Sequence, residues 1–249
     1  MDAEHGRMVM LEVVAVPVLT DNYVWLIHNG ETGETAAVDP SVVDPVLDAV
    51  GAKGWSLTQI LNTHWHPDHT GGNQGIKAAT GSPITAPAEA RKVSEVDRVV
   101  SEGDRVTVAG AEAVVWDIPA HTAGHIAYYF EAEGMIFVGD TMFAMGCGRL
   151  FEGTAEQMYS NMQRIAGLPD DVRIYCGHEY TLANASFAEH AEPDNEAVKR
   201  RMTEVKAFRD QGKITLPTTV AEERETNPFV RATNSEDFAR LRSAKDSFR

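Results

Sequence analysis

The stretch Thr63-His64-Trp65-His66-Pro67-Asp68-His69 is the most informative part of this chain. It places four side chains that can bind metal within six residues, directly after the apolar, strand-like run Leu57 to Leu61. Imidazole and carboxylate groups suit zinc, iron and manganese alike. Four such ligands in so short a loop cannot easily converge on one tetrahedral ion, so the pattern predicts two ions about 3.5–4 Å apart. If the side chains alternate in direction along the loop, His64 and His66 face one ion while Asp68 and His69 face the other.

More ligands are therefore needed, and three later segments offer them. The strand-like runs Ala113 to Ile118, Met135 to Val138 and Arg173 to Cys176 lead into His121, Asp140 and His178. In each case a short β-rich segment stops at a turn that contains Gly or Pro, with the His or Asp at its tip. Taken singly, each of these residues fits an ordinary loop. Their repetition beside the first motif instead predicts ligands held at one edge of a sheet.

The order H-x-H-x-D-H, H-T-x-G-H, G-D-T and C-G-H-E-Y resembles the metallo-β-lactamase fold, and within it the glyoxalase II, or hydroxyacylglutathione hydrolase, branch. Further motifs that match this branch are Leu19-Thr20-Asp21-Asn22-Tyr23, Gly146-Cys147-Gly148-Arg149, Phe151-Glu152-Gly153, Asn227-Pro228-Phe229 and Lys245-Asp246-Ser247-Phe248. The resemblance runs from about Val9 to Phe248. The metal motifs specify only the superfamily, and the C-terminal half specifies the branch.

Hydrophobic patterning predicts an α+β chain in two parts. Strands are expected at Val9–Val18, Tyr23–His28, Thr35–Asp39, Leu57–Leu61, Arg105–Val108, Ala113–Ile118, Ile126–Glu131, Met135–Val138 and Arg173–Cys176. Helices are expected at Val42–Val50, after Gly72, and at Thr154–Ile165, Leu182–His190, Asn195–Gln211 and Ser235–Phe248. Mixed strands and helices fit a sandwich of sheets with helices on its outer faces. We therefore predict a metallo-β-lactamase-like αββα sandwich in residues 1–178, which binds metal and is catalytic, and a small helical domain in residues 179–249, which the resemblance makes the glutathione-binding part.

The resemblance also implies a role for each ligand. The first metal is held by His64, His66 and His121, and the second by Asp68, His69 and His178. Asp140 bridges both ions, which share a hydroxide that attacks the substrate, so Asp140 and Asp68 are the carboxylates that take part in catalysis. Zinc is the first expectation for the two divalent ions, with iron or manganese as alternatives. His125 is expected to pack behind the ligands, and Cys176, two residues before His178, remains an alternative ligand.

The substrate implied by the resemblance is a glutathione thioester, chiefly S-D-lactoylglutathione. Its contacts are expected at Arg149, Phe151, Tyr180, Arg242 and Lys245. Arg242 and Lys245 lie three apart on one helical face, so they can converge on one carboxylate. Alternatively, they only complement the dipole of the last helical turn. Arg149 and Phe151 stand where relatives commonly carry Lys and Tyr, which changes the contacts near the thioester.

Composition limits the remaining possibilities. A formal net charge of −15 argues against a nucleic-acid surface. The chain contains no apolar run long enough for a membrane span, and its start, Met1 to His5, lacks the layout of a signal peptide. Two cysteines are too few for a disulfide framework. We expect a cytoplasmic monomer that binds neither nucleic acid nor membrane.

Several other functions share parts of this pattern. A β-lactamase is disfavoured because cysteine commonly replaces the aspartate at the position of Asp140. A tRNA-processing nuclease is disfavoured because it would need a basic surface, which the acidic composition of this chain does not indicate. A persulfide dioxygenase is disfavoured because it uses one iron and lacks the C-terminal domain. The alternatives that stay open are a binuclear hydrolase of another thioester or a lactone, and a metal-binding or glutathione-binding module without turnover.

Overall fold

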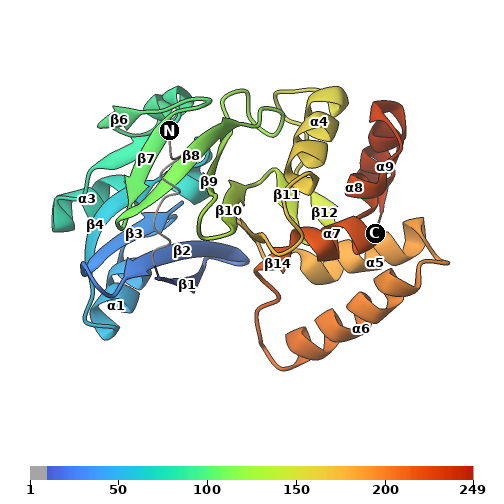
Figure 1. The fold of residues 1–249 in the computed structure, drawn as a ribbon, viewed down its shortest axis with the longest axis horizontal. Coiled ribbons are helices and arrows are strands. Elements are labelled where there is room, and N and C mark those ends of the chain that lie inside the picture. The colour runs from blue at the N-terminus through green and yellow to red at the C-terminus, as the bar shows by residue number, and fades with distance from the viewer. Residues whose placement is uncertain (1–9, 249) are drawn as a thin grey trace, which may run out of the picture. The chain divides into compact units, whose positions relative to one another are not determined.

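The computed structural model describes residues 10–248 (Figure 1). The stretch Met1 to His5 and Val9, the predicted start of the first strand, lie outside the described residues. Contacts divide the chain into two compact units. The first takes the chain up to Asp117 together with Gly124–Gly139, and the second takes Ile118–Ala123 and the chain from Asp140 onward.

The first unit contains a mixed sheet of six strands in the order β1-β2-β3-β4-β5-β6. Its strands are β1 (Leu11–Val18), β2 (Asn22–Asn29), β3 (Glu34–Val38), β4 (Ser56–Leu61), β5 (Ile84–Ala86) and β6 (Arg98–Val99). The first three pair antiparallel, and pairing from β3 to β6 is parallel. Parallel neighbours need a crossover connection. The helices α1 (Asp44–Ala52) and α3 (Asn73–Thr80) lie in these crossovers, and the 3-10 helix η1 (Ala88–Lys92) joins β5 to β6.

The same unit contains an antiparallel meander in the order β10-β9-β8-β7. Its strands are β7 (Arg105–Val108), β8 (Ala111–Asp117), β9 (Ile126–Phe130) and β10 (Met135–Gly139). Strands β9 and β10 are buried at every position. The buried hydroxyl of Tyr128 donates to the carbonyl groups of Asn62 and Thr85, so the meander packs on the end of β4 and on β5.

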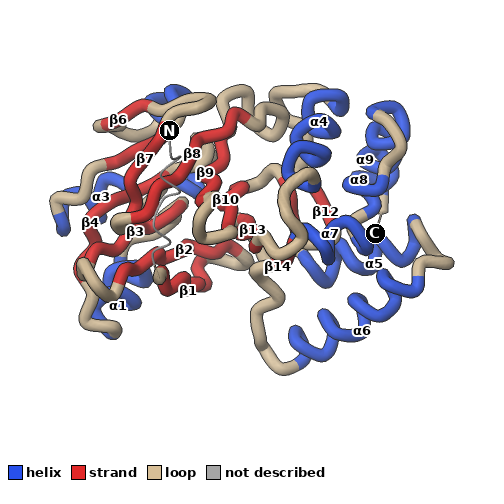
Figure 2. The backbone as a smooth tube through the Cα atoms, in the orientation of Figure 1, coloured by secondary structure: helices blue, strands red, loops and turns tan. Residues whose placement is uncertain are grey.

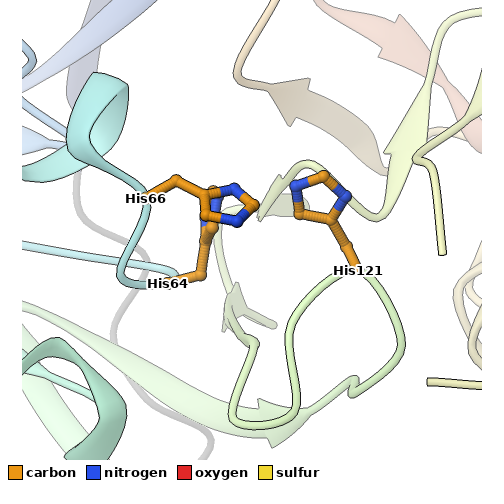
Figure 3. Close-up of side chains that lie close together, drawn as sticks. All are labelled: His64, His66 and His121. Atoms are coloured by element: carbon orange, nitrogen blue, oxygen red, sulfur yellow. The ribbon is translucent and has the colours of Figure 1, made fainter. Parts of the chain in front are cut away.

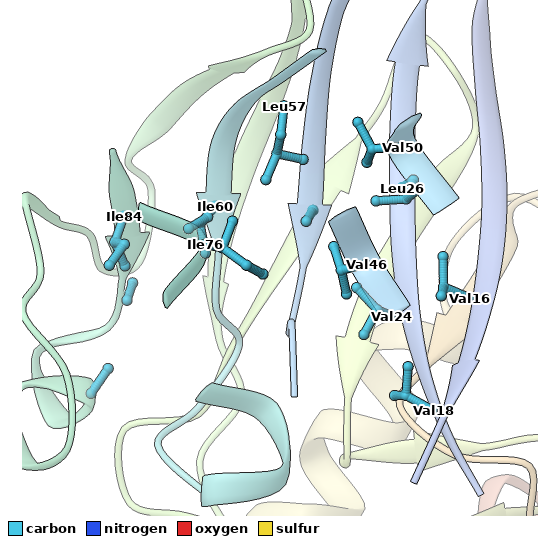
Figure 4. Packing of buried hydrophobic residues seen from close by; sticks show 13 residues of the cluster. Val16, Val18, Val24, Leu26, Val46, Val50, Leu57, Ile60, Ile76 and Ile84 are labelled. Atoms are coloured by element: carbon cyan, nitrogen blue, oxygen red, sulfur yellow. The ribbon is translucent and has the colours of Figure 1, made fainter. Parts of the chain in front are cut away.

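The core of the first sheet lies under its two crossover helices (Figure 4). Val46 and Val50 of α1 and Ile76 of α3 pack on Leu26 and Ile60 of the sheet. Each such side chain, when fully buried, contributes about 1.5–3 kcal/mol. The helices therefore cover one face of this sheet and leave its other face for the meander.

The second unit is mostly helical, as the blue segments of the later chain show in Figure 2. Its elements are β11 (Met142–Phe143), β12 (Gly146–Cys147), α4 (Ala155–Ala166), β13 (Arg173–Cys176), α5 (Thr181–Ala191), α6 (Glu196–Asp210), β14 (Thr218–Thr219), α7 (Val220–Thr226), α8 (Pro228–Arg231) and α9 (Ser235–Ser247). Side-chain caps begin the longer helices. Thr154 and Gln157 form a capping box on α4, and Asn195 and Asn234 cap α6 and α9.

The structure confirms every predicted strand and helix, with ends within two residues of those expected, apart from the unassessed position Val9. The hydrophobic pattern did not predict α7 and α8, which lie between the last two long helices, α6 and α9. The α7 sequence Val-Ala-Glu-Glu-Arg-Glu-Thr has too few apolar residues for a helical stripe. Among residues 10–248, no helix has the length and apolar character that crossing a membrane requires.

Candidate functional site

The ligand loop of the first unit begins where β4 ends, and Asp39 holds its first residue. The carboxylate of Asp39 accepts the backbone N–H of Thr63 at 2.8 Å and the Thr63 hydroxyl at 2.7 Å. Asp39 lies directly after β3 and has a φ of 53°, which is uncommon for a residue other than glycine. Because β3 and β4 are neighbours in the sheet, this buried bond fixes the direction in which the loop leaves it.

His64 and His66 present ring nitrogens to each other within this loop (Figure 3). Nε2 of His64 lies 3.1 Å from Nδ1 of His66. The other nitrogen of His64 lies 3.0 Å from the Thr63 hydroxyl. The ring of His125 is stacked on that of His64 at 4.5 Å, with 16° between the planes, so His125 packs against a predicted ligand.

Asp68 and His69 lie in the short helix α2 (Pro67–Thr70) that follows. His69 places Nδ1 3.1 Å from a carboxylate oxygen of Asp39 and Nε2 3.6 Å from Oδ2 of Asp68. Asn22, at the start of β2, donates to the same Asp68 oxygen at 3.1 Å. The Asp68 carboxylate is therefore oriented toward His69, while 40% of its side chain stays exposed.

Gly139, at the end of β10, lies against this loop from the meander side. A Cβ atom there would come within 2.3 Å of the Thr63 hydroxyl and 2.8 Å of the His125 ring. Its φ of 48° also favours glycine. Only a residue without a side chain fits between β10 and the ligand loop.

In the second unit, two imidazoles converge on Asp140. Nε2 of His178 lies 3.2 Å from Oδ2 of Asp140, and Nε2 of His121 lies 3.5 Å from the same oxygen. All three side chains are buried. Nδ1 of His121 lies 2.9 Å from the carbonyl of Arg149, and a Cβ at Gly148 would collide with the carbonyl of Asp140. The Gly146–Arg149 motif thus lies tightly against two of the predicted ligands.

Aromatic rings surround these two histidines. Tyr180 is stacked on His178, with centroids 4.7 Å apart and 6° between the planes. Phe143 meets both rings edge-on, at 5.9 Å from His178 and 5.1 Å from Tyr180. Phe151 meets the His121 ring at 5.2 Å and is 60% exposed. The predicted substrate residues Phe151 and Tyr180 therefore lie directly beside predicted ligands.

The three basic substrate candidates differ in their surroundings. Arg149 is largely exposed, with Nε 3.9 Å from Asp246. Arg242 is buried, and its guanidinium donates to the Cys147 carbonyl at 2.8 Å and to Asp246 at 2.9 Å. Lys245 is half-buried and donates to the Ala183 carbonyl at 2.9 Å. Burial lowers the pKa of Lys245. Arg242 and Lys245 thus both hold backbone carbonyl groups within the second unit.

Both cysteines are free and buried. Burial raises the pKa of Cys147 to about 11 and that of Cys176 further still. The Cys176 thiol lies 3.6 Å from the carbonyl of His178 and donates to it. The Cys176 thiol is thus directed at a backbone carbonyl group of the chain.

The donor set suits divalent metal ions. Histidines that bind metal usually give their second ring nitrogen to a carboxylate, a carbonyl or a similar group. His69 and His121 have such partners in Asp39 and the Arg149 carbonyl, and each directs Nε2 toward an aspartate. The first unit carries four of the predicted ligands and the second unit carries three.

Sequence reasoning missed several residues that orient these ligands. Asp39 was recognised only as the end of a strand, although strand-end aspartates were the signal that found Asp140. Asn22 lies in a motif of the resemblance but was given no role. Nothing in the local sequence distinguishes Phe143 from a core phenylalanine.

Comparison with known proteins identifies the class first. A model of the metallo-beta-lactamase superfamily matches residues 20–178, so the chain is a member of that superfamily. A model described as the hydroxyacylglutathione hydrolase C-terminus matches residues 179–248.

Curated relatives then identify the family within this superfamily. The hydroxyacylglutathione hydrolase of Methylococcus capsulatus is 48% identical over 93% of this chain and 91% of its own length. That of Erythrobacter litoralis is 46% identical over 96% of this chain and 100% of its own length. The chain belongs to the hydroxyacylglutathione hydrolase family.

Solved structures agree on the fold. ETHE1 from Myxococcus xanthus has a TM-score of 0.72 at 24% identity, covering 94% of this chain and 90% of that one. The BLEG-1 B3 metallo-beta-lactamase has a TM-score of 0.69 at 18% identity, with 88% and 99% covered. A protein in a di-iron-bound form has a TM-score of 0.63 at 21% identity, also with 88% and 99% covered. These likenesses confirm the predicted metallo-β-lactamase fold.

Proposed function

We propose that this protein hydrolyses the thioester of S-(2-hydroxyacyl)glutathiones, chiefly S-D-lactoylglutathione, to glutathione and the hydroxy acid, at a centre of two divalent metal ions. Its family makes it a thiolester hydrolase, because relatives aligned over nearly the whole chain are hydroxyacylglutathione hydrolases. The preference for the D-lactoyl group and the two-metal centre are the parts that need a test.

We assign seven side chains to the centre. One ion would be held by His64, His66 and His121, the other by Asp68, His69 and His178, with Asp140 between them. The observation that carries this assignment is the geometry inside each unit. His64 and His66 present nitrogens 3.1 Å apart, and His121 and His178 both direct Nε2 to one Asp140 oxygen. Such convergence of basic nitrogens and a carboxylate is what a divalent cation requires.

Bound divalent ions would supply a nucleophile at neutral pH by lowering the pKa of a coordinated water, and would polarise the thioester carbonyl. The side chains around the proposed centre orient the groups that take part in this reaction. Asp68, held by Asn22, is the partly exposed carboxylate that can accept a proton in passing. Asp39 would keep His69 in the tautomer that carries its proton on Nδ1, because the Asp39 carboxylate oxygen accepts a hydrogen bond from that N–H. The leaving thiolate has a conjugate acid with a pKa of about 8.5, so no separate general acid is needed.

The substrate side is proposed on the second unit. Tyr180, stacked on His178, and Phe151, at the edge of His121, are placed to contact a ligand bound at those histidines. Arg149 is the exposed guanidinium of the set and the first candidate for a glutathione carboxylate. Lys245 keeps an ammonium at a half-buried position, while Arg242 would act by keeping Cys147 and Asp246 in place.

Further features belong to the same proposal. Zinc is the first choice of metal, since histidine and carboxylate ligands suit it, and iron or manganese are the alternatives. Residues 1–178 would form the catalytic domain and 179–249 the glutathione-binding domain, a division at which the two family models also meet. We propose a cytoplasmic monomer, and the two free thiols support the cytoplasmic location, since they fit a reducing compartment. Gel filtration of the zinc-loaded protein tests the monomer.

The deciding experiment compares substrates on metal-loaded protein. S-D-lactoylglutathione, a simple uncharged thioester, a lactone, a β-lactam and a phosphodiester are offered at matched concentrations. The glutathione thioester should be cleaved with by far the largest kcat/KM. The Asp68→Asn variant should lose most of this activity. As a control, Asp210→Asn removes the same charge at an exposed position at the end of α6 and should leave it intact. Faster cleavage of any other substrate would overturn the proposal.

A further inference from the structure

The hairpin β11–β12 has a turn that its sequence does not favour. Phe143 pairs with Gly146, which leaves Ala144 and Met145 as a two-residue turn. Met145 has a φ of 58°, a left-handed conformation that glycine or asparagine usually occupies. Its side chain is nevertheless buried, in a cluster with Ala185, Ala188 and Val198. At position 145 the methionine side chain therefore adds buried contacts that glycine could not make. Because its left-handed backbone is unfavourable, other contacts must hold that conformation.

Two buried polar side chains provide those contacts. Oε2 of Glu223, on α7, accepts the backbone N–H of Met145 at 2.9 Å. The amide of Asn227 donates to the Gly146 carbonyl at 2.9 Å, to the Phe143 carbonyl at 3.3 Å and to Oε2 of Glu223 at 2.7 Å. The two side chains thus hold both ends and the middle of the turn, and they also hold each other.

The rest of the surroundings support the same arrangement. The other Glu223 oxygen accepts the Thr218 hydroxyl at 2.6 Å. Asn184 donates to the Ala144 carbonyl at 3.2 Å, and its amide occupies the space that a Cβ at Gly146 would need. Glu223 is 1% exposed, and no salt bridge among residues 10–248 includes it. Burying an ionisable carboxyl without a cation partner is costly, and three hydrogen bonds to Glu223 offset part of that cost.

The hairpin leads directly to the site. Phe143, the residue before the turn, places its ring edge-on to both His178 and Tyr180. Any shift of the turn moves Phe143, because Asn227 binds its carbonyl. The path from Glu223 to His178 therefore passes through one backbone turn and one aromatic ring, all within the second unit.

We propose that Glu223 and Asn227 are positioning residues, which clamp the strained turn at Met145 so that Phe143 holds His178 and Tyr180 in place. The Asn227-Pro228-Phe229 motif thereby gains a role: its proline begins α8 at the first position, and its asparagine both caps that helix and binds the hairpin. Both parts of this inference rest on the proposed function: the metal-binding part rests on the proposed metal centre, and the kinetic part rests on the proposed substrate.

The test compares Glu223→Ala and Asn227→Ala with Glu223→Gln. Glutamine keeps an oxygen for the Met145 N–H and can donate its NH2 to the Thr218 hydroxyl, so it should behave like the parent. Alanine leaves the Met145 N–H without an acceptor. Zinc affinity is measured by competition with a chromophoric chelator, and kcat and KM are measured with S-D-lactoylglutathione. Both alanine variants should bind the weaker zinc equivalent roughly tenfold or more less tightly, the loss typical of groups that orient ligands.

A double-variant cycle separates positioning from general destabilisation. Phe143→Ala should weaken zinc binding by itself, and adding Glu223→Ala should then change the affinity less than about twofold, because coupled effects are not additive. Val50→Ala, in the α1 core of the first unit, is the matched control that lowers the melting temperature without moving zinc affinity.

Two results would overturn the inference. One is the finding that Glu223→Ala lowers the stability of the protein but keeps the zinc affinity and kcat of the parent. Glu223 would then have a purely structural role. The other is fully multiplicative losses in the Glu223 and Phe143 double variant. A parent protein that binds zinc but does not cleave lactoylglutathione would instead refute the proposed substrate, and the zinc comparison would still decide the role of Glu223.

Discussion

The buried carboxyl of Glu223 predicts how stability depends on pH. Burial raises the pKa of Glu223 from 4.5 to about 7, while bonds from Thr218, Asn227 and the Met145 N–H act in the opposite direction. Nearby Glu222 adds a smaller upward influence. A carboxyl with a higher pKa in the folded chain is stabilising in its protonated form. Its contribution is fully present below pH 4.5 and is lost as the pH rises through about 7.

The size of the effect follows from the two pKa values. Each pH unit between them is worth about 1.4 kcal/mol, so ionising Glu223 in the fold costs about 3 kcal/mol at alkaline pH. Glu223→Gln keeps the shape and cannot ionise. The difference in unfolding free energy between variant and parent should therefore move by about 3 kcal/mol in favour of the variant as the pH rises, mostly between pH 5 and 7.

Urea unfolding of metal-free protein, monitored by circular dichroism at a series of pH values, measures this difference. Other titrating groups are common to both proteins and cancel. Val50→Ala, which lowers stability without removing a titratable group, is the control, and its difference from the parent should not change with pH. Parallel stability curves for the parent and Glu223→Gln would refute the reasoning, because Glu223 would then titrate like an ordinary carboxyl.

The remaining predictions concern the metals and the basic residues. Carefully prepared protein should hold close to two metal equivalents, and a fully active preparation with one equivalent would contradict the binuclear centre. Asp140→Asn should weaken metal binding at both sites and lower kcat by at least about a hundredfold, so unchanged metal content and turnover would show that the bridge is misplaced. Lys245→Ala should raise KM several-fold and lower the melting temperature less than Arg242→Ala does, because Lys245 gives up one bond, to the Ala183 carbonyl. Arg242→Ala should lose about 2–3 kcal/mol of stability, because it gives up charged bonds to the Cys147 carbonyl and to Asp246. Equal melting temperatures for these two variants would argue against a structural role for Arg242. A double variant that combines both substitutions should lose roughly tenfold or more in kcat/KM.

Much of the fold was predictable because its signals are local. The apolar runs, the turns that end them and the helix caps lie within a few residues of the elements they define, as with Thr154 and Gln157 at α4. The helices α7 and α8 were not predicted, because the sequence gives no local helical pattern for them. The α7 sequence is too polar to show an apolar stripe, and α8 has only four residues, too few to show a helical period, so the caps at Thr219 and Asn227 and the packing of the folded chain form them.

The residues that we predict to bind metal could be named from the sequence alone, because their residue types and their places after strands are local features: His64, His66, Asp68, His69, His121, Asp140 and His178. The sequence could not show what orients them. The bond from Asp39 to Thr63 spans 24 residues and that from Glu223 to Met145 spans 78. Such partners meet only when the chain has folded, since no local spacing encodes a contact between distant segments. The tertiary structure alone decided that Arg242 is buried, that Phe143 lies against His178 and Tyr180, and that an ionisable carboxyl holds a strained turn beside them.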